Sequence, residues 1–228
     1  FRNAEFFKLT FRSSFESQGR INGSRWFNAT EQSLTGSLTI PRLVLFPRLD
    51  KNINFVNTKT ILTTSGIYEL NTNFERRVFT SGVIYQVNKK YASFYITPLE
   101  ISYTKNAVNS DTLRSLIDKD IYLFSMFSNN LILGSRFGFT YTDKQKHKGT
   151  HWIYLRWDVL ELSGNIATGV SKLLNRDLSA AGTYSLFGVN YSQFAKSAID
   201  FRYNTKIDPN NATVFRMFAG VGMPYGNS

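Results

Sequence analysis

The sequence predicts an all-β protein, a transmembrane antiparallel β-barrel to which this chain contributes about nine strands. Three observations predict this fold class. Apolar and polar residues alternate over long segments, several of these segments reach about 10–13 residues where ordinary strands average 5–6, and tight turns and long loops join them. Alternating segments of this length match tilted strands that cross a bilayer.

The alternation is clearest in residues 5–16, where phenylalanine and leucine occupy odd positions and charged or hydroxyl residues occupy most even ones. A period of two places successive side chains on opposite faces of a strand. Each such segment therefore has one apolar and one polar face. The same pattern predicts strands at residues 78–88, 131–142, 195–207 and 213–223.

Four weaker segments complete the predicted strands, at residues 31–40, 58–70, 91–103 and 151–166. In the last segment the apolar phase slips between Val159 and Leu160. Such a slip predicts a β-bulge, because one extra residue moves every later side chain to the other face. Pro41 and Pro98 are expected at strand ends or bulges, since a central strand tolerates proline poorly.

The connections add a second kind of information. Residues 88–90 and 208–211 are rich in turn-forming residues and are predicted as tight hairpin turns. Residues 105–130 and 174–192 are predicted as long loops, the first with a short helix capped at Ser110 and ending at Ile117. Short turns on one side and long loops on the other are typical of outer-membrane barrels. Residues 47–57 depart from that pattern, because they form a long connection where a short turn is expected.

The two faces of the strands differ in chemistry. The apolar faces are bulky and aromatic-rich, and the polar faces carry full charges of both signs at mid-strand. In a soluble sandwich the apolar face packs on a second sheet, whereas in a membrane barrel it meets lipid and the polar face lines the lumen. We favour the barrel and keep a soluble β-sandwich binding module as an alternative. The predicted lumen-lining charge network comprises Arg136, Arg156, Asp158, Lys196, Asp200, Arg202 and Arg216.

Composition excludes several classes of protein. The 228 residues contain no cysteine, which excludes a disulfide scaffold and any cysteine-ligated metal. No apolar run approaches about 18 residues, so no transmembrane helix is predicted. The chain opens at Phe1 without methionine or an apolar leader, so we expect a processed product or a fragment. A net charge of +11 permits nucleic acid, anionic lipid or an internal charge network as the partner.

Other motifs give little support to a catalytic, metal or nucleic-acid site. His147 and His151 have the spacing of a helical zinc site, but they flank a polar turn and no third ligand is near. There is no nucleophile elbow and no dinucleotide-binding loop followed by a helix. The basic residues alternate with aliphatic ones and mix with acidic ones, unlike a groove for single-stranded nucleic acid. We therefore expect no enzyme activity, no cofactor, no metal and no nucleic acid.

Two lysine clusters lie in predicted turns, Lys89 with Lys90, and Lys144, Lys146 and Lys148. They are interpreted as turns on the periplasmic rim of the barrel. They either keep exposed turns soluble or contact phosphate-bearing head groups, and both interpretations stay open.

Five stretches resemble, in the same order, segments of the BamA/TamA family of outer-membrane assembly barrels, in the Bacteroidetes-type TamA-like branch that carries the bacterial surface antigen domain. The most specific is the C-terminal run, NATVFRMFAGVGMPYGNS at residues 211–228. The other stretches are residues 27–42, with Leu-Thr-Ile-Pro-Arg at its end, 95–101, 162–165 and 191–203. The resemblance thus covers nearly the whole chain, residues 1–228, as part of one barrel domain.

The resemblance implies a sixteen-stranded barrel preceded by POTRA domains, of which this chain spans roughly the third to eleventh strands. The POTRA domains, the first and last strands and the family's lid-loop motif are not in the chain. Small and turn-forming residues at the end of the chain are expected to let the lid loop approach: Gly220, Gly222, Pro224, Tyr225 and Gly226.

The resemblance also implies a location and a role, with no covalent chemistry. The protein is expected to be integral to the bacterial outer membrane and to insert or export other outer-membrane or surface proteins. Its expected partners are outer-membrane lipid, these client proteins, and accessory lipoproteins or a periplasm-spanning partner. A passive porin-like channel or receptor barrel is the alternative, because the same strands and lumen charges would serve it.

Overall fold

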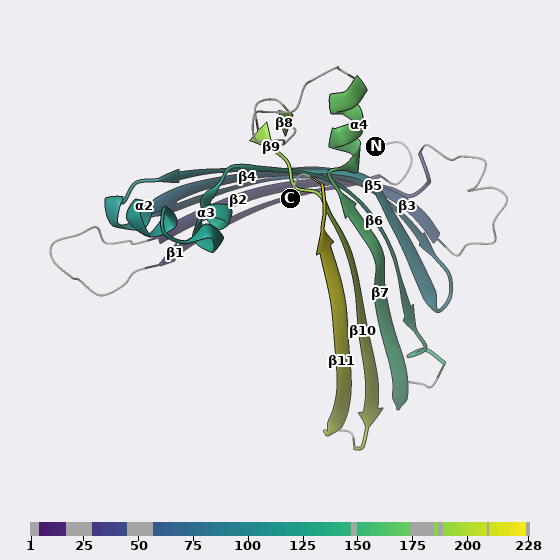
Figure 1. The fold of residues 1–228 in the computed structure, drawn as a ribbon. Helices are drawn as coiled ribbons and strands as arrows, with labels where there is room; N and C mark the ends of the chain where they lie inside the picture. The colour runs from purple at the N-terminus through teal and green to yellow at the C-terminus, as the bar shows by residue number, and fades with distance from the viewer. Residues whose placement is uncertain are drawn as a thin grey trace.

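A computed structural model of the chain describes residues 5–16, 29–44, 57–146, 150–173, 185–186, 189–208 and 210–226. Within these residues the fold is all-β, built on one antiparallel sheet of nine strands (Figure 1). Their order in the sheet is β1-β2-β3-β4-β5-β6-β7-β10-β11, so each strand pairs with its neighbour among the long strands of the chain. The two remaining strands, β8 and β9, form a separate short pair.

All nine predicted strand segments are confirmed, with ends that shift by a few residues. The strands of the sheet are β1 (Phe6–Glu16), β2 (Ala29–Ile40), β3 (Asn57–Asn71), β4 (Phe74–Asn88), β5 (Ala92–Val108), β6 (Asn130–Thr142), β7 (His151–Ser163), β10 (Phe194–Lys206) and β11 (Ala212–Pro224). The short pair is β8 (Ser185–Leu186) and β9 (Val189–Asn190). In Figure 1 the direction of β1–β4 lies across that of β10 and β11, so the sheet twists strongly along its width.

The pairing register keeps the alternation of each strand in phase with its neighbours. Phe11 lies opposite Leu34, which lies opposite Gly66, and Gly66 lies opposite Phe79. The sheet therefore has two chemically distinct faces. We call the face that carries Phe11 and Phe79 the apolar face, and the other, which carries Asp158 and Asp200, the charged face.

Two bulges keep this division intact. Phe137 pairs with Leu160 while Gly138 pairs with Asp158, so Val159 is the extra residue and the predicted bulge in β7 is confirmed. A second bulge lies in β5 between Thr97 and Glu100, around Pro98. Proline fits there because the bulge removes the need for its missing N–H. Odd-numbered and even-numbered residues exchange faces at each bulge. The residues that face the charged side therefore change from odd to even numbers in β5 and from even to odd numbers in β7.

The tight turns are confirmed where the structure describes them. The Lys89 N–H donates to the Ala92 carbonyl at 2.7 Å and closes the β4–β5 turn. At the β10–β11 turn the Asp208 N–H donates to the Asn211 carbonyl at 3.2 Å, while Pro209 lies outside the described residues. Residues 47–56, within the unexpectedly long connection, also lie outside them.

Three helices occupy the longer connections: α2 (Asp111–Ile117), α3 (Ile121–Phe127) and α4 (Asn165–Leu173). α2 is the predicted helix, and its cap Ser110 accepts a hydrogen bond from the Leu113 N–H at 3.4 Å. The prediction of a strand through Ile166 was wrong. β7 ends at Ser163 because Gly164 takes a φ of +79° that turns the chain into α4. No helix in the described part of the chain is long and apolar enough to cross a membrane.

The residues after β7 build the one hydrophobic cluster found among the described residues. Leu131 and Leu133 of β6 pack there against Ala167 of α4, Leu186 and Tyr191. Ile101 and Tyr103 of β5 extend the contact. The three helices lie at one end of the sheet, here called the helix end, and the turns β4–β5, β6–β7 and β10–β11 lie at the other, the turn end. α4 and β8–β9 thus cover part of the apolar face at the helix end.

Candidate functional site on the charged face

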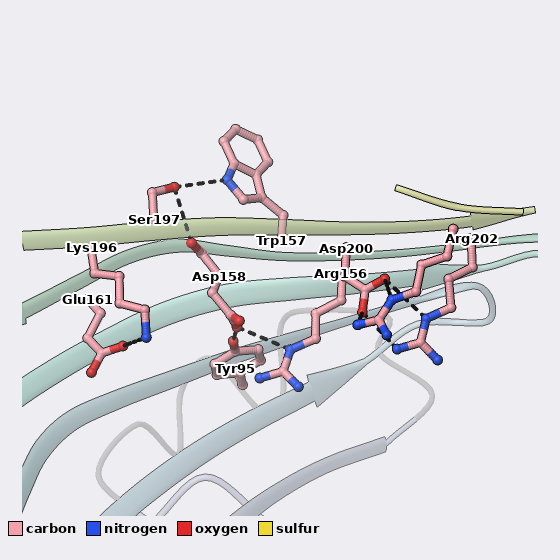
Figure 2. Close-up of polar contacts among 10 residues, drawn as sticks. Tyr95, Arg156, Trp157, Asp158, Glu161, Lys196, Ser197, Asp200 and Arg202 are labelled. Carbon is pink, nitrogen blue, oxygen red and sulfur yellow. Dashed lines mark hydrogen bonds and ion pairs between the residues drawn. The ribbon is translucent and has the colours of Figure 1, made fainter. Parts of the chain in front are cut away.

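All seven residues of the predicted charge network lie on the charged face. Arg136 comes from β6 and pairs in register with Glu161 of β7, and Asp200 of β10 lies opposite Arg156. Figure 2 shows the side chains of Arg156, Asp158 and Asp200 leaving their strands on one side, while Trp157 leaves on the other. The remaining members, Lys196, Arg202 and Arg216, have the same parity on β10 and β11.

Asp200 is the best-connected group of the face. Its side chain is 11% exposed, and its two oxygens accept four hydrogen bonds from two guanidinium groups. Arg202 donates through Nε at 3.1 Å and Nη2 at 2.7 Å, and Arg216 donates through Nε at 3.1 Å and Nη2 at 2.8 Å. Arg202 and Arg216 lie directly opposite one another in the ladder. Asp200 therefore holds together two like charges that would otherwise repel across the strand pair.

A second cluster joins β5 to β7 across β6. The Tyr95 hydroxyl donates to the Asp158 carboxylate in a short hydrogen bond, and Arg156 Nε donates to the same oxygen at 3.3 Å. The strand between them carries Gly138, which pairs with Tyr95 on one side and Asp158 on the other. Glycine leaves the space over which the tyrosine ring reaches Asp158 (Figure 2).

Two further carboxylates pair with the remaining predicted cations. Arg136 Nη2 forms a short ion pair with Glu100 of β5. Lys196 Nζ lies 4.0 Å from Glu161 of β7. The sequence-based set omitted Glu100, Glu161 and Tyr95. The two glutamates follow bulges, so simple alternation places them on the wrong face, although the phase slip at Val159 was the signal that could have corrected Glu161.

The arrangement is an ion-paired wall. Every carboxylate of the set has a cationic partner, and the pairs extend over five strands, β5, β6, β7, β10 and β11. Within the described ranges no group of three or more histidine, aspartate or glutamate side chains could hold a metal ion. His147, one of the two spaced histidines, lies outside those ranges. Such a wall can bind and align polar or charged groups that pass along it.

The predicted lid-loop residues separate into two groups. Gly220 and Gly222 lie on the charged face of β11, where a side chain on Gly222 would meet nothing within 4 Å and one on Gly220 would meet Ala198 at 3.4 Å. Pro224, the last residue of β11, instead leads into a segment that folds onto the start of α4.

This second group, Tyr225 and Gly226 after Pro224, is fixed by hydrogen bonds. The Tyr225 N–H donates to the Gln193 carbonyl at 3.1 Å, and the Tyr225 hydroxyl donates to Asn165 Oδ1 at 2.9 Å. Gly226 has a φ of +59° and lies against the Gln193 side chain, where a Cβ atom would collide. The segment thus anchors the edge strand β11 at the helix end of the sheet.

Replacing Asp200 by asparagine should lower the free energy of unfolding by about 1–3 kcal/mol. Asparagine cannot accept two bidentate guanidiniums, so Arg202 and Arg216 would repel one another, although their partial exposure reduces the cost. The urea midpoint of the folded protein measures this change. Asp208→Asn is the matched control, because the one contact that its carboxylate makes within the described residues is with the turn residue Asn211 at 3.3 Å. Equal midpoints for the two variants would show that the Asp200 cluster adds no stability.

Comparisons with protein-family models, with curated proteins and with solved structures found no match to this chain. The charged face and its apolar counterpart are therefore interpreted from their own chemistry.

Proposed function

We propose that the chain is part of the wall of a transmembrane β-barrel in the bacterial outer membrane. Its proposed role, which follows from the resemblance to the BamA/TamA family, is to insert or export other outer-membrane or surface proteins. The observation that carries the membrane location is the exposure of the apolar face.

Large apolar side chains are exposed on the apolar face of every strand in the sheet. Phe11 is 66% exposed at one edge and Met217 is 54% exposed at the other. Monomeric soluble proteins rarely expose contiguous apolar patches larger than a few hundred Å². Contact with lipid would remove these apolar side chains from water. One such residue from each strand, in sheet order, is Phe11, Leu34, Leu62, Phe79, Ile96, Phe137, Leu160, Tyr203 and Met217.

The total exposed area supports the same conclusion. The chain has an accessible surface of 15882 Å². A compact soluble monomer of 26.1 kDa exposes roughly 10,600 Å². The excess is consistent with a single sheet that keeps both faces accessible rather than with a sandwich, in which two sheets cover each other's apolar faces.

The opposite face has the chemistry of a lumen. Its charges occur in pairs and bidentate clusters, such as Asp200 with Arg202 and Arg216, on strands whose other side is apolar. Within a membrane barrel, charges of this kind are tolerated at mid-strand on the water-filled side and are costly on the lipid side. In Figure 2 they extend to the side on which the earlier strands of the sheet lie.

The strand count supports a larger barrel. β1 and β11 form the two edges of the sheet, and because the nine strands alternate in direction the two edges run parallel to each other. Closing this sheet on itself would need a parallel seam. An entirely antiparallel barrel therefore requires an odd number of additional strands, which agrees with the seven that a sixteen-stranded barrel would add. A bilayer would not accept the two unpaired edges as they stand.

The proposed role can be tested by depletion of the full-length gene product in its host. We expect the protein to fractionate with the outer membrane and its loss to lower the amounts of other outer-membrane or surface proteins. Normal levels of those proteins, together with a large, steady single-channel conductance of the purified barrel, would instead support the passive channel. Recovery only in the soluble fraction would favour the β-sandwich module.

A further inference from the structure

Five lysines lie together on the turn end of the sheet. Lys89 and Lys90 form the β4–β5 turn, Lys144 and Lys146 belong to the β6–β7 connection, and Lys206 ends β10. All five side chains are exposed. We call this set the basic rim.

The basic rim is continuous because its turns are joined side by side. The Thr142 N–H donates to the Tyr91 carbonyl at 2.8 Å, which connects the β4–β5 turn to the end of β6. The Lys206 N–H donates to the Thr150 carbonyl at 2.7 Å, which connects the end of β10 to the start of β7. The lysines thus follow the turn end of the sheet from β4 to β10.

Little negative charge balances this rim. In the described part of these three connections the acidic residues are Asp143 and Asp208. Asp143 is buried, at 7% exposure, and accepts a hydrogen bond from the Ile153 N–H at 2.6 Å. The helix end differs, because its charges are of both signs and several are paired, such as Arg76 with Glu69 at 3.6 Å. Among the described residues, the turn end therefore carries more net positive charge than the helix end.

Aromatic rings contact two of the five lysines. Lys90 Nζ lies 5.2 Å from the centre of the Tyr91 ring, and Lys144 Nζ lies 5.0 Å from the centre of the Trp152 ring. Trp152 lies opposite Asn204 and has the parity of the charged face, so its ring holds the Lys144 ammonium group at the turn end without facing the lipid side.

We propose that the basic rim binds the phosphate groups of anionic glycerophospholipids in the leaflet next to the turn end. This inference rests on the proposed membrane location and adds a specific ligand class to it. It resolves the open interpretation of the lysine clusters in favour of head-group contact. The contact would fix the depth and the tilt of the barrel wall at this end.

Short-chain phosphatidylglycerol, titrated into the full-length protein in neutral detergent and followed by native mass spectrometry, tests the proposal. We expect saturable, salt-sensitive binding, and no saturation with phosphatidylcholine of the same chain length. The triple variant Lys90→Gln, Lys144→Gln, Lys146→Gln should weaken the affinity by about tenfold or more, since each lysine near an anionic surface contributes about a few-fold.

The matched control removes the same charge from the helix end, through Lys105→Gln, Lys119→Gln and Lys172→Gln, all exposed there. It should change the affinity by less than about twofold. Equal losses in the two triple variants, equal binding of the two lipids, or rim-dependent binding of single-stranded DNA instead of phosphatidylglycerol would each overturn the proposal. If the wild-type protein enters neither micelles nor phosphatidylcholine vesicles, the membrane location itself fails, which is a separate result.

Discussion

Replacing Phe137 by arginine is expected to block insertion of the protein into the membrane. Phe137 lies in the middle of β6 on the apolar face, is 41% exposed, and has Ile96 and Leu160 as its ladder neighbours. An arginine that faces lipid at the bilayer midplane costs about 2–4 kcal/mol. The fraction of folded protein recovered in vesicles, read from its resistance to unfolding in detergent on a gel, should fall accordingly.

Thr140→Arg is the control from the same strand, three residues further along and on the charged face. Thr140 pairs with Arg156, so the new arginine should cost about 1 kcal/mol or less through like-charge repulsion in a solvated environment. Insertion should therefore persist. If both variants insert equally well, the assignment of the apolar face to lipid is wrong.

The strands could be predicted from the sequence because their signal is local. Alternation over residues 5–16 or 213–223 defines a strand without reference to any partner, and the slip at Val159 marks a bulge directly. The two helices that were not predicted, α3 and α4, lack that advantage. α4 follows a strand without interruption, and only the positive φ of Gly164 separates the two elements. Gly164 stands between Ser163 and Asn165, and a single glycine does not by itself reveal such a turn.

The charged face was predicted only in part, for a related reason. Parity assigns Arg136, Asp200 and Arg216 to one face, and the structure places them there. Which cation or hydroxyl pairs with which carboxylate depends on the register between strands that are far apart in the chain. The contact between Tyr95 and Asp158 is an example. Register is set by turns and bulges together, so no single segment contains it. The pairing of Arg202 and Arg216 on one aspartate could not be read from either strand alone.

Replacing Gly138 by alanine is expected to destabilise the protein by about 3 kcal/mol, at the upper end of the cost of overpacking. A Cβ atom at this position would lie 2.6 Å from Cζ of Tyr95 and 2.8 Å from the backbone carbonyl oxygen of Trp157. The tyrosine ring can move, at the expense of its hydrogen bond to Asp158, but the carbonyl belongs to the β7 backbone and cannot move without disturbing the ladder. The urea midpoint of the folded protein in micelles measures the loss.

Gly66→Ala provides the comparison, because it substitutes another glycine in the same sheet where a Cβ atom would meet nothing within 4 Å. Alanine in a strand loses less backbone entropy on folding than glycine, so this variant should be neutral or more stable by about 0.5 kcal/mol. The two substitutions thus have opposite expected signs. Adding Tyr95→Ala to Gly138→Ala should recover only part of the stability, since the contact with the Trp157 carbonyl remains. Full recovery would show that the ring alone requires glycine there, and equal stability of Gly138→Ala and Gly66→Ala would show that the approach of Tyr95 to Asp158 places no demand on β6.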